Sequence, residues 1–150
     1  MDRILIDTDI ILDFFFDREP FSENASKILS LCELKEVKGF VTPVIISNVY
    51  YLLRRSAKHE KVIEKLTLLI SLLEVLVIDK KVIMKALNSD FKDFEDALQN
   101  YSAELNDEVD IIITRNIKDY KNSHLSVMLP DNYIKTKNAN TQQTACCYGG

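Results

Sequence analysis

Short apolar runs alternate along the chain with longer segments in which apolar residues recur every three or four positions. The short runs, rich in Ile, Val and Leu, predict strands at about residues 3–6, 40–42, 74–78, 111–114 and 125–128. The longer segments predict helices at about residues 8–16, 22–39, 43–55, 59–72, 79–87 and 93–105. Because strands alternate with helices, we expect a three-layer α/β/α fold around a central, mostly parallel sheet of four to five strands.

The predicted helices carry start and stop signals. Ser22, Asp79 and Asp93 are expected N-caps, because their side-chain oxygens can accept the free backbone N–H groups of a first turn. Pro43 suits the first position of a helix, and Gly39 suits the end of the preceding one. These residues set the expected helix boundaries.

The composition changes near residue 135. From there to residue 150, Asn, Gln, Thr and Lys dominate, whereas residues 1–134 have ordinary globular patterning. We therefore expect one domain over residues 1–134. Residues 135–150 are expected to form a polar C-terminal tail that is disordered or held only by contacts with another molecule.

Net charge and cysteine content narrow the classes of function. The chain has 150 residues, a net charge of −4 and a pI near 5.2, so it lacks the basic character of a general nucleic-acid-binding domain. A polynucleotide partner would have to meet a local basic patch or bound cations. The three cysteines form no disulfide framework or zinc spacing, and no apolar run reaches the roughly 18 residues of a membrane span. We expect a cytoplasmic protein without membrane contact, in which Cys32 is a buried apolar residue.

Acidic and amide residues follow the predicted strands at one edge of the sheet. Asp7 comes directly after the first strand, and Asn116 and Asp119 come after the fourth. In open α/β sheets, ligand crevices lie outside the carboxyl ends of the strands. Asp110 precedes its strand and is expected at the opposite edge, too far away to share an ion with Asp7.

A second acidic group lies at the predicted start of helix 93–105. Asp93 and Asp96 are three residues apart and so share one helix face. Capping is the other explanation, with Asp93 as N-cap and with Glu95 and Asp96 complementing the helix dipole. Both interpretations stay open. Asp13, in the first predicted helix, is expected to be solvated or ion-paired.

Carboxylates gathered at one sheet edge repel one another, so each raises the pKa of its neighbours. Mg²⁺ and Mn²⁺ relieve such repulsion, since they bind one or two carboxylates together with several waters and substrate phosphate oxygens. A cation held this way lowers the pKa of water and stabilises in-line displacement at phosphorus. The acidic residues therefore indicate metal-dependent phosphodiester hydrolysis.

Four segments, spread in order over most of residues 3–129, resemble the PIN domain, a small metal-dependent ribonuclease fold that includes the VapC-type toxins. They are residues 6–13, 42–52, 93–99 and 112–120. The first resembles the family's opening strand and Asp-Thr-Asn motif, and the last resembles its closing strand and Thr-Arg-Asn loop. Each motif is short, and the specific signal is their order and spacing.

The resemblance implies roles for individual residues. Asp7, Asp96 and Asp119 would hold Mg²⁺ or Mn²⁺ and carry catalysis. The supporting residues that it implies are Asp9, Asn48, Asp93, Thr114 and Asn116. Asn48 stands where the family usually has Glu, so one negative charge is missing there. Asp9 replaces the usual Asn and restores part of that charge.

Basic residues follow the helix that carries Asn48. Arg54 and Arg55 are either substrate-binding phosphate contacts or a solvated helix end favoured by the helix dipole. The apolar surfaces of helices 44–53 and 62–73 either pack on each other or form a homodimer interface.

The leading hypothesis is a Mg²⁺- or Mn²⁺-dependent endoribonuclease that hydrolyses RNA, as the toxin of a toxin–antitoxin pair with an antitoxin protein as partner. The alternative is a catalytically weak PIN scaffold that binds RNA or a protein, and Asn48 motivates it. A nuclease for structured DNA ranks third, because the chain shows no helical insertion that could thread a strand.

Overall fold

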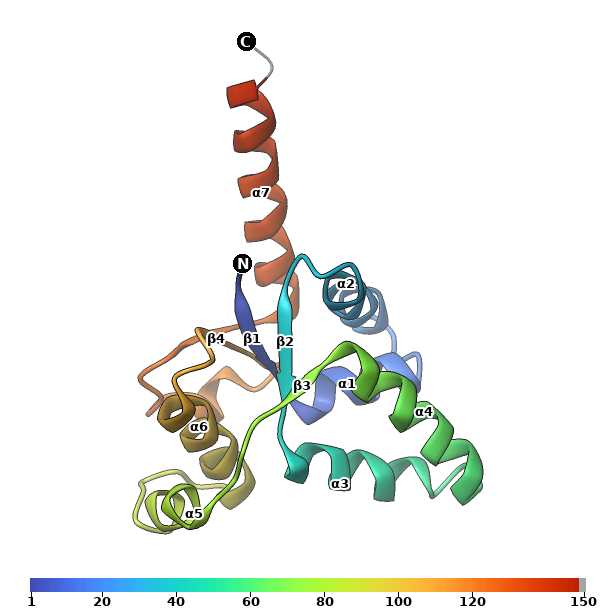
Figure 1. Ribbon diagram of the computed structural model, residues 1–150, viewed down its shortest axis with the longest axis vertical. Coiled ribbons are helices and arrows are strands. Elements are labelled where there is room, and N and C mark those ends of the chain that lie inside the picture. The colour runs from blue at the N-terminus through green and yellow to red at the C-terminus, as the bar shows by residue number, and fades with distance from the viewer. Residues whose placement is uncertain (149–150) are drawn as a thin grey trace.

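The central feature of the fold is a five-stranded parallel sheet. The structure is a computed structural model that describes residues 1–148. Its strands are β1 (Arg3–Ile6), β2 (Lys38–Val41), β3 (Glu74–Val75), β4 (Ile111–Ile113) and β5 (Ser126–Met128). They lie in the order β3-β2-β1-β4-β5, and each neighbouring pair is parallel (Figure 1). The predicted parallel sheet of four to five strands is confirmed.

Helices cover both faces of this sheet. They are α1 (Thr8–Phe15), α2 (Ser22–Glu33), α3 (Pro43–Leu53), α4 (His59–Leu72), α5 (Lys80–Leu87), α6 (Phe94–Asn106) and α7 (Pro130–Tyr148), with a 3-10 helix η1 (Ile117–Tyr120). α1, α2 and α4 lie on one side, and α5 and α6 lie on the other (Figure 1). α3 lies beyond the carboxyl ends of the strands (Figure 1). The three-layer α/β/α architecture is therefore confirmed.

The middle strand, β1, is fully buried from Ile4 to Ile6. A parallel strand covered by helices on both faces requires such an uninterrupted apolar run. Its last residue, Ile6, pairs with Ile113 at the end of β4, so the two strands end side by side. This register places Asp7 at the middle of the carboxyl edge of the sheet.

Most of the predicted helix starts are confirmed. Asp79 accepts a hydrogen bond from the backbone N–H of Val82 at 3.1 Å and caps α5. Pro43 is the first residue of α3, whose N-cap is Thr42. The expected N-cap Ser22 is wrong, because Ser22 already belongs to α2 and its hydroxyl donates to Glu19 at 3.4 Å.

The predicted end of the second helix near Gly39 is also wrong. α2 ends at Glu33, and Lys35 has a left-handed φ of 59° that stops a right-handed helix. Gly39 lies inside β2, where a Cβ atom would come within 2.6 Å of the Cys32 sulfur. The glycine is needed for close packing of β2 on α2. The prediction that Cys32 is buried is confirmed.

Residues 74–78 were expected to be one complete strand, and only Glu74 and Val75 pair with β2. The backbone N–H of Leu76 still donates to the carbonyl of Val41 at 2.8 Å. Strand β2 ends at Val41 and the backbone turns into α3, so residues 77 and 78 have no strand to pair with. β3 is short because its neighbour ends.

The expectation of a disordered C-terminal tail is wrong for the residues described, since α7 continues from Pro130 to Tyr148 (Figure 1). Tyr133 and Ile134 are buried in the main core, and the Tyr133 hydroxyl donates to Asp2 at 2.8 Å. These contacts anchor the first turns, and the polar residues that follow extend the helix away from the body. Among the described residues, no helix is long and apolar enough to cross a membrane.

Candidate active site

The ends of β1 and β4 build the floor of the candidate site. The backbone N–H of Asp7 donates to the carbonyl of Ile113 at 3.1 Å, which continues the pairing of the two strands by one residue. Asp7 then leaves the sheet and becomes the N-cap of α1. Thr114, the residue after β4, is fully buried beside it. Strand pairing thus brings together two predicted site residues that are far apart in the sequence.

The Asp7 carboxylate is held at both oxygens. Its Oδ1 accepts from the Thr8 backbone N–H at 2.8 Å, and its Oδ2 accepts from the Thr114 hydroxyl at 2.8 Å. Only 5% of Asp7 is exposed. The pKa of Asp7 is raised to about 6, chiefly by burial and also by the charges of Asp9 and Asp119, although the two hydrogen bonds lower it.

α6 supplies the second predicted acid, Asp96. Its pKa is raised to about 7, first by burial and then by the charges of Asp7, Asp93 and Asp119. The hydroxyl of Tyr120 lies 3.3 Å from Asp96 Oδ1. Asp7 and Asp96 line the same pocket, so the structure brings the two predicted acids together.

Asp93 both caps α6 and lies at the candidate site, so its position fits both of the interpretations that the sequence left open. Its side chain caps α6 by accepting from the backbone N–H of Asp96 at 3.1 Å. It also lines the pocket that contains Asp7 and Asp96. Capping therefore holds Asp93 at the rim of the site.

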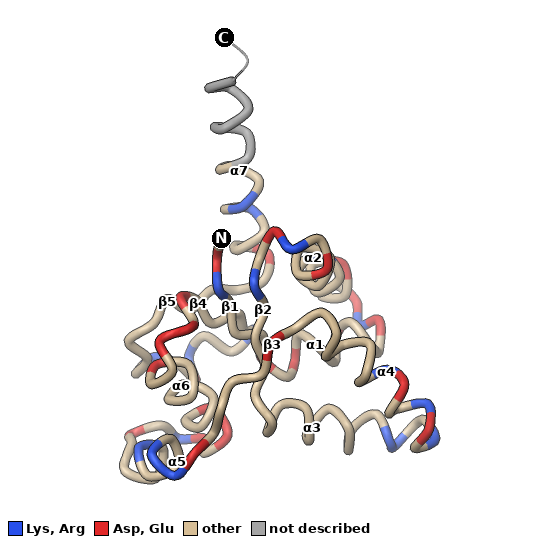
Figure 2. The backbone as a smooth tube through the Cα atoms, in the orientation of Figure 1, with Lys and Arg blue, Asp and Glu red and all other residues tan. Residues whose placement is uncertain are grey.

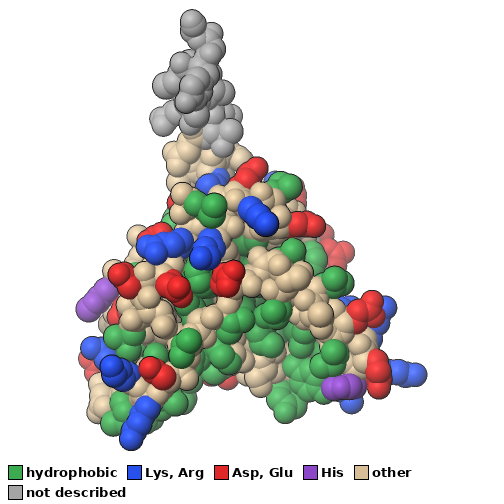
Figure 3. Space-filling model, in the orientation of Figure 1, with side chains coloured by type: hydrophobic (Ala, Val, Ile, Leu, Met, Phe, Trp, Pro, Cys, Tyr) green, Lys and Arg blue, Asp and Glu red, His purple; other side chains and the backbone are tan. Residues whose placement is uncertain are grey.

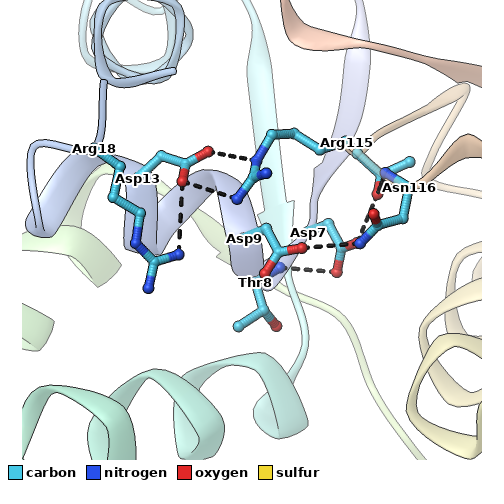
Figure 4. Close-up of polar contacts among 8 residues, drawn as sticks. Asp7, Thr8, Asp9, Asp13, Arg18, Arg115 and Asn116 are labelled. Carbon is cyan, nitrogen blue, oxygen red and sulfur yellow. Dashed lines mark hydrogen bonds and ion pairs between the residues drawn. The ribbon is translucent and has the colours of Figure 1, made fainter. Parts of the chain in front are cut away.

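The loop after β4 ties the site to α1. The backbone N–H of Asn116 donates to the Thr114 hydroxyl oxygen at 3.0 Å, and its side-chain amide donates to Asp9 at 2.9 Å. Figure 4 shows Asp7, Asp9 and Asn116 close together where α1 begins. Thr114 thus accepts from one site residue while it donates to another.

A partly buried ion pair fixes this loop from its other side. Arg115 donates to Asp13 through Nε at 2.8 Å and Nη2 at 3.1 Å (Figure 4). Arg18 lies 3.7 Å from the same carboxylate, and the Arg115 guanidinium stacks over Phe21 at 4.1 Å. Only 1% of the Asp13 side chain is exposed, so it is ion-paired and not solvated.

These side chains surround an open pocket of about 480 Å³. Its lining residues are Asp7, Thr8, Asp9, Leu12, Asn48, Tyr51, Leu52, Arg55, Asp93, Glu95, Asp96, Gln99, Asn116 and Asp119. All of the predicted acids and amides of the site therefore meet there, with Thr114 directly behind Asp7. Arg55 lines the pocket, and Arg54 does not, because its guanidinium donates to the carbonyl of Ala57 at 2.8 Å. Asp110 pairs with Arg3 at 2.8 Å, at the amino end of β1 as expected.

Sequence reasoning missed Glu95, which was considered only as a residue of the first helical turn. Its carboxylate accepts from the Asn48 side-chain amide at 2.9 Å and lines the pocket. No sequence pattern relates the two residues, since α3 and α6 meet only after folding. The pocket therefore has a carboxylate beside Asn48 even though residue 48 itself carries no charge.

The donor set fits a hard divalent cation. Carboxylate, hydroxyl and amide oxygens are the ligands that Mg²⁺ and Mn²⁺ prefer. The Thr8 hydroxyl oxygen, next to Asp7, is buried and has no hydrogen-bond partner among the described side chains. Within the described part of the chain, no three His, Cys, Asp or Glu residues are close enough to hold a metal ion by themselves. A cation bound here would therefore have to complete its coordination with waters, of which Mg²⁺ usually keeps several.

The PIN domain family matches residues 3–118, and the chain belongs to this family. The comparison with curated proteins gives no match. Solved structures share the fold at low identity, so the likeness concerns the fold alone.

One of these structures is VapBC2 from Rickettsia felis bound to a DNA fragment from its promoter, at 18% identity and a TM-score of 0.63, covering 85% of this chain and 98% of that one. A toxin–antitoxin complex from Klebsiella pneumoniae has 22% identity, a TM-score of 0.64 and coverage of 85% and 97%. Mycobacterium tuberculosis VapC20, a Sarcin-Ricin loop cleaving toxin, has 15% identity, a TM-score of 0.57 and coverage of 73% and 86%.

Proposed function

We propose that the protein is a divalent-metal-dependent endoribonuclease and the toxin of a toxin–antitoxin pair. The observation that carries this proposal is the pocket shared by Asp7 and Asp96, whose carboxylates come from different elements, with the charge of Asp7 raising the pKa of Asp96. Such repulsion costs stability, and a divalent cation bound between the carboxylates would neutralise it. The similar solved structures include toxin–antitoxin complexes and a toxin that cleaves the Sarcin-Ricin loop.

Each residue has a distinct task in this proposal. Asp7, Asp96 and Asp119 hold Mg²⁺ or Mn²⁺, and Thr114 fixes the orientation of Asp7 through its 2.8 Å hydrogen bond. When bound, the cation supplies a water of lowered pKa and neutralises charge that develops on the phosphodiester. Arg55 brings positive charge to the pocket and so favours the approach of RNA.

The alternative function is that of a catalytically weak scaffold, and the absence of an acid at residue 48 is the reason for considering it. The carboxylate of Glu95, 2.9 Å from the Asn48 amide, keeps negative charge at this side of the pocket and favours the active nuclease. The two functions differ in their response to Asn48→Glu. In an active enzyme the new carboxylate repels Glu95 and lowers activity, whereas in a weak scaffold it creates Mn²⁺-dependent cleavage that the wild type lacks.

Cleavage of RNA by the purified protein in Mg²⁺, Mn²⁺ or EDTA tests the proposal. We expect cleavage that requires the cation and that Asp7→Asn or Asp96→Asn each lowers by more than the roughly 10- to 100-fold loss typical of outer-sphere partners. Glu108→Gln is the matched control, because it removes one charge at the opposite edge of the sheet. Equal cleavage by the wild type and both aspartate variants would exclude this assignment.

An apolar cavity of about 240 Å³ between α1, α2 and α4 is suited to an antitoxin segment. The apolar side chains that line it are Phe14, Phe15, Leu29, Leu68, Leu69 and Leu72. Leu68 is 65% exposed. Leu68→Arg should therefore weaken binding of an antitoxin and leave RNA cleavage unchanged, and unchanged binding would show that the antitoxin lies elsewhere.

The homodimer and the cytoplasmic location stay predictions. α3 and α4 pack on each other, and hydrophobic side chains still gather around β3 and α3 on the face seen in Figure 3. A second copy of the chain could cover this surface. Light scattering of the purified protein would distinguish a dimer from a monomer.

A further inference from the structure

The pocket has an aromatic and basic wall in addition to its carboxylates. Asn48, Tyr51 and Leu52 line it from α3, and Arg55 lines it from the turn that follows. A spacing of three and four residues places such side chains on one side of a helix. Figure 2 shows basic residues gathered where α3 leads into α4. Neither Tyr51 nor Arg55 is a ligand of the kind that Mg²⁺ or Mn²⁺ prefers, so this wall needs a different explanation.

Tyr51 exposes a large aromatic ring at the mouth of the pocket. Its exposed fraction is 68%, although it belongs to a well-formed helix. Tyr50 contacts it edge-to-face, with ring centroids 5.0 Å apart. The Tyr50 hydroxyl lies 2.9 Å from Nδ1 of His59, which restrains the supporting ring. One side of Tyr51 is therefore supported, and the remainder is open to a planar ligand.

Arg55 is the only basic residue among the described residues that line the pocket. No hydrogen bond or ion pair engages its guanidinium among side chains 1–140, in contrast to Arg54 and its bond to Ala57. A guanidinium without a partner is available to an anionic ligand, and its hydrogen bonds to phosphate are charge-assisted. Arg55 thus has the chemistry of a phosphate contact beside Tyr51.

We propose that Tyr51 and Arg55 form a nucleotide-binding subsite, in which a nucleobase stacks on Tyr51 and an adjacent phosphate binds Arg55. Leu12 and Leu52 line the same pocket and add apolar surface for the base. The subsite deepens the proposed ribonuclease function and rests on it for the nature of the polymer. A base inside a duplex is already stacked on its neighbours, so the subsite takes a base that is unstacked.

The test measures the binding of short RNA oligonucleotides to the wild type and to variants. The oligonucleotides carry 2-aminopurine, a fluorescent base, at each position in turn. Stacking on Tyr51 should quench the fluorescence at one position. An abasic residue at that position should weaken binding to the wild type roughly 5- to 150-fold, the range for loss of one stacked base. For Tyr51→Ala the intact and abasic RNAs should bind alike, whereas Tyr51→Phe should behave as the wild type.

Arg55 is tested in the same assay by its salt dependence. Arg55→Ala should lower the slope of log affinity against log salt by about 0.7, the value for one phosphate contact on a single strand. Arg54→Ala is the matched control and should leave the slope unchanged. Leu87→Ala, at a residue of similar exposure in α5 and outside the pocket, controls for Tyr51→Ala.

The outcomes separate the subsite from the proposed function. Binding that depends on Tyr51 without any cleavage would support the subsite and refute the ribonuclease. In the opposite outcome, the protein cleaves RNA while the abasic change weakens binding equally for the wild type and for Tyr51→Ala. That result would refute the subsite and leave the ribonuclease function standing. Failure of the wild type to bind any of the oligonucleotides would also overturn the subsite.

Discussion

Neutralising Asp96 should stabilise the metal-free protein, because its carboxylate is held in the pocket against repulsion. The pKa of Asp96 is raised from 3.8 to about 7 by burial and by the charges of Asp7, Asp93 and Asp119. A shift of this size corresponds to at most roughly 4 kcal/mol, at about 1.4 kcal/mol for each pKa unit. Asp96 is only half-buried and shares its repulsion with Asp7, so we expect a gain of about 1–2 kcal/mol for Asp96→Asn above pH 7.

The sign of the effect follows from proton linkage. The folded protein binds the Asp96 proton more tightly than the unfolded chain, whose carboxyl has an ordinary pKa of about 4. The loss of folding free energy caused by the Asp96 carboxylate is therefore absent below about pH 4. It grows as the pH rises to about 7 and stays constant above that pH. The Tyr120 hydroxyl lies 2.9 Å from Gln99 Oε1 and 3.3 Å from Asp96 Oδ1, and an Asn side chain at residue 96 still offers it an acceptor oxygen.

Urea unfolding in EDTA at pH 8 and at pH 4.5 measures this effect. Asp96→Asn should have a higher free energy of unfolding than the wild type at pH 8, and the difference should shrink at pH 4.5. Glu108→Gln, exposed at the opposite sheet edge, should show no such difference. The argument would be refuted by a variant that is no more stable than the wild type at pH 8.

Three further outcomes are expected. Mn²⁺ should raise the melting temperature of the wild type more than that of Asp96→Asn, as thermal unfolding would show, and equal shifts would place the ion elsewhere. Asp13→Asn should lower the free energy of unfolding by about 3 kcal/mol, because it leaves the partly buried Arg115 charge without its partner. A loss below about 1 kcal/mol in urea unfolding would show that the pair behaves as an exposed surface pair. Gly39→Ala should cost about 1–3 kcal/mol through overpacking against Cys32, and an unchanged unfolding midpoint would show that the strand can shift.

The sequence predicts those features of the fold and of the site that depend on the local residue pattern or on the parallel arrangement of the strands. The apolar run before Asp7 identifies a buried central strand, and the parallel arrangement then brings the residues after β1 and β4 to one edge. Asp93 and Asp79 are recognisable as caps because capping acts within one turn. Features of this kind need only neighbouring residues or the general rules of parallel sheets.

Features that depend on how distant elements meet could not be predicted. Glu95 became a pocket residue through its contact with Asn48, and Asp13 became buried through Arg115, which is 102 positions away in the chain. The order of the C-terminal residues depends on Tyr133, which anchors α7 in the core although the segment after it is polar. In each case the deciding contact joins segments whose relation is set only by the fold.

The central claim is that Asp7, Asp96 and Asp119 form one site for a divalent cation. Anomalous diffraction from crystals soaked in Mn²⁺ tests it most directly. The account predicts a manganese peak in the pocket between Asp7 and Asp96, and no peak there in crystals of Asp96→Asn. A wild-type pocket without a peak at saturating Mn²⁺, or a peak confined to another surface, would contradict the account.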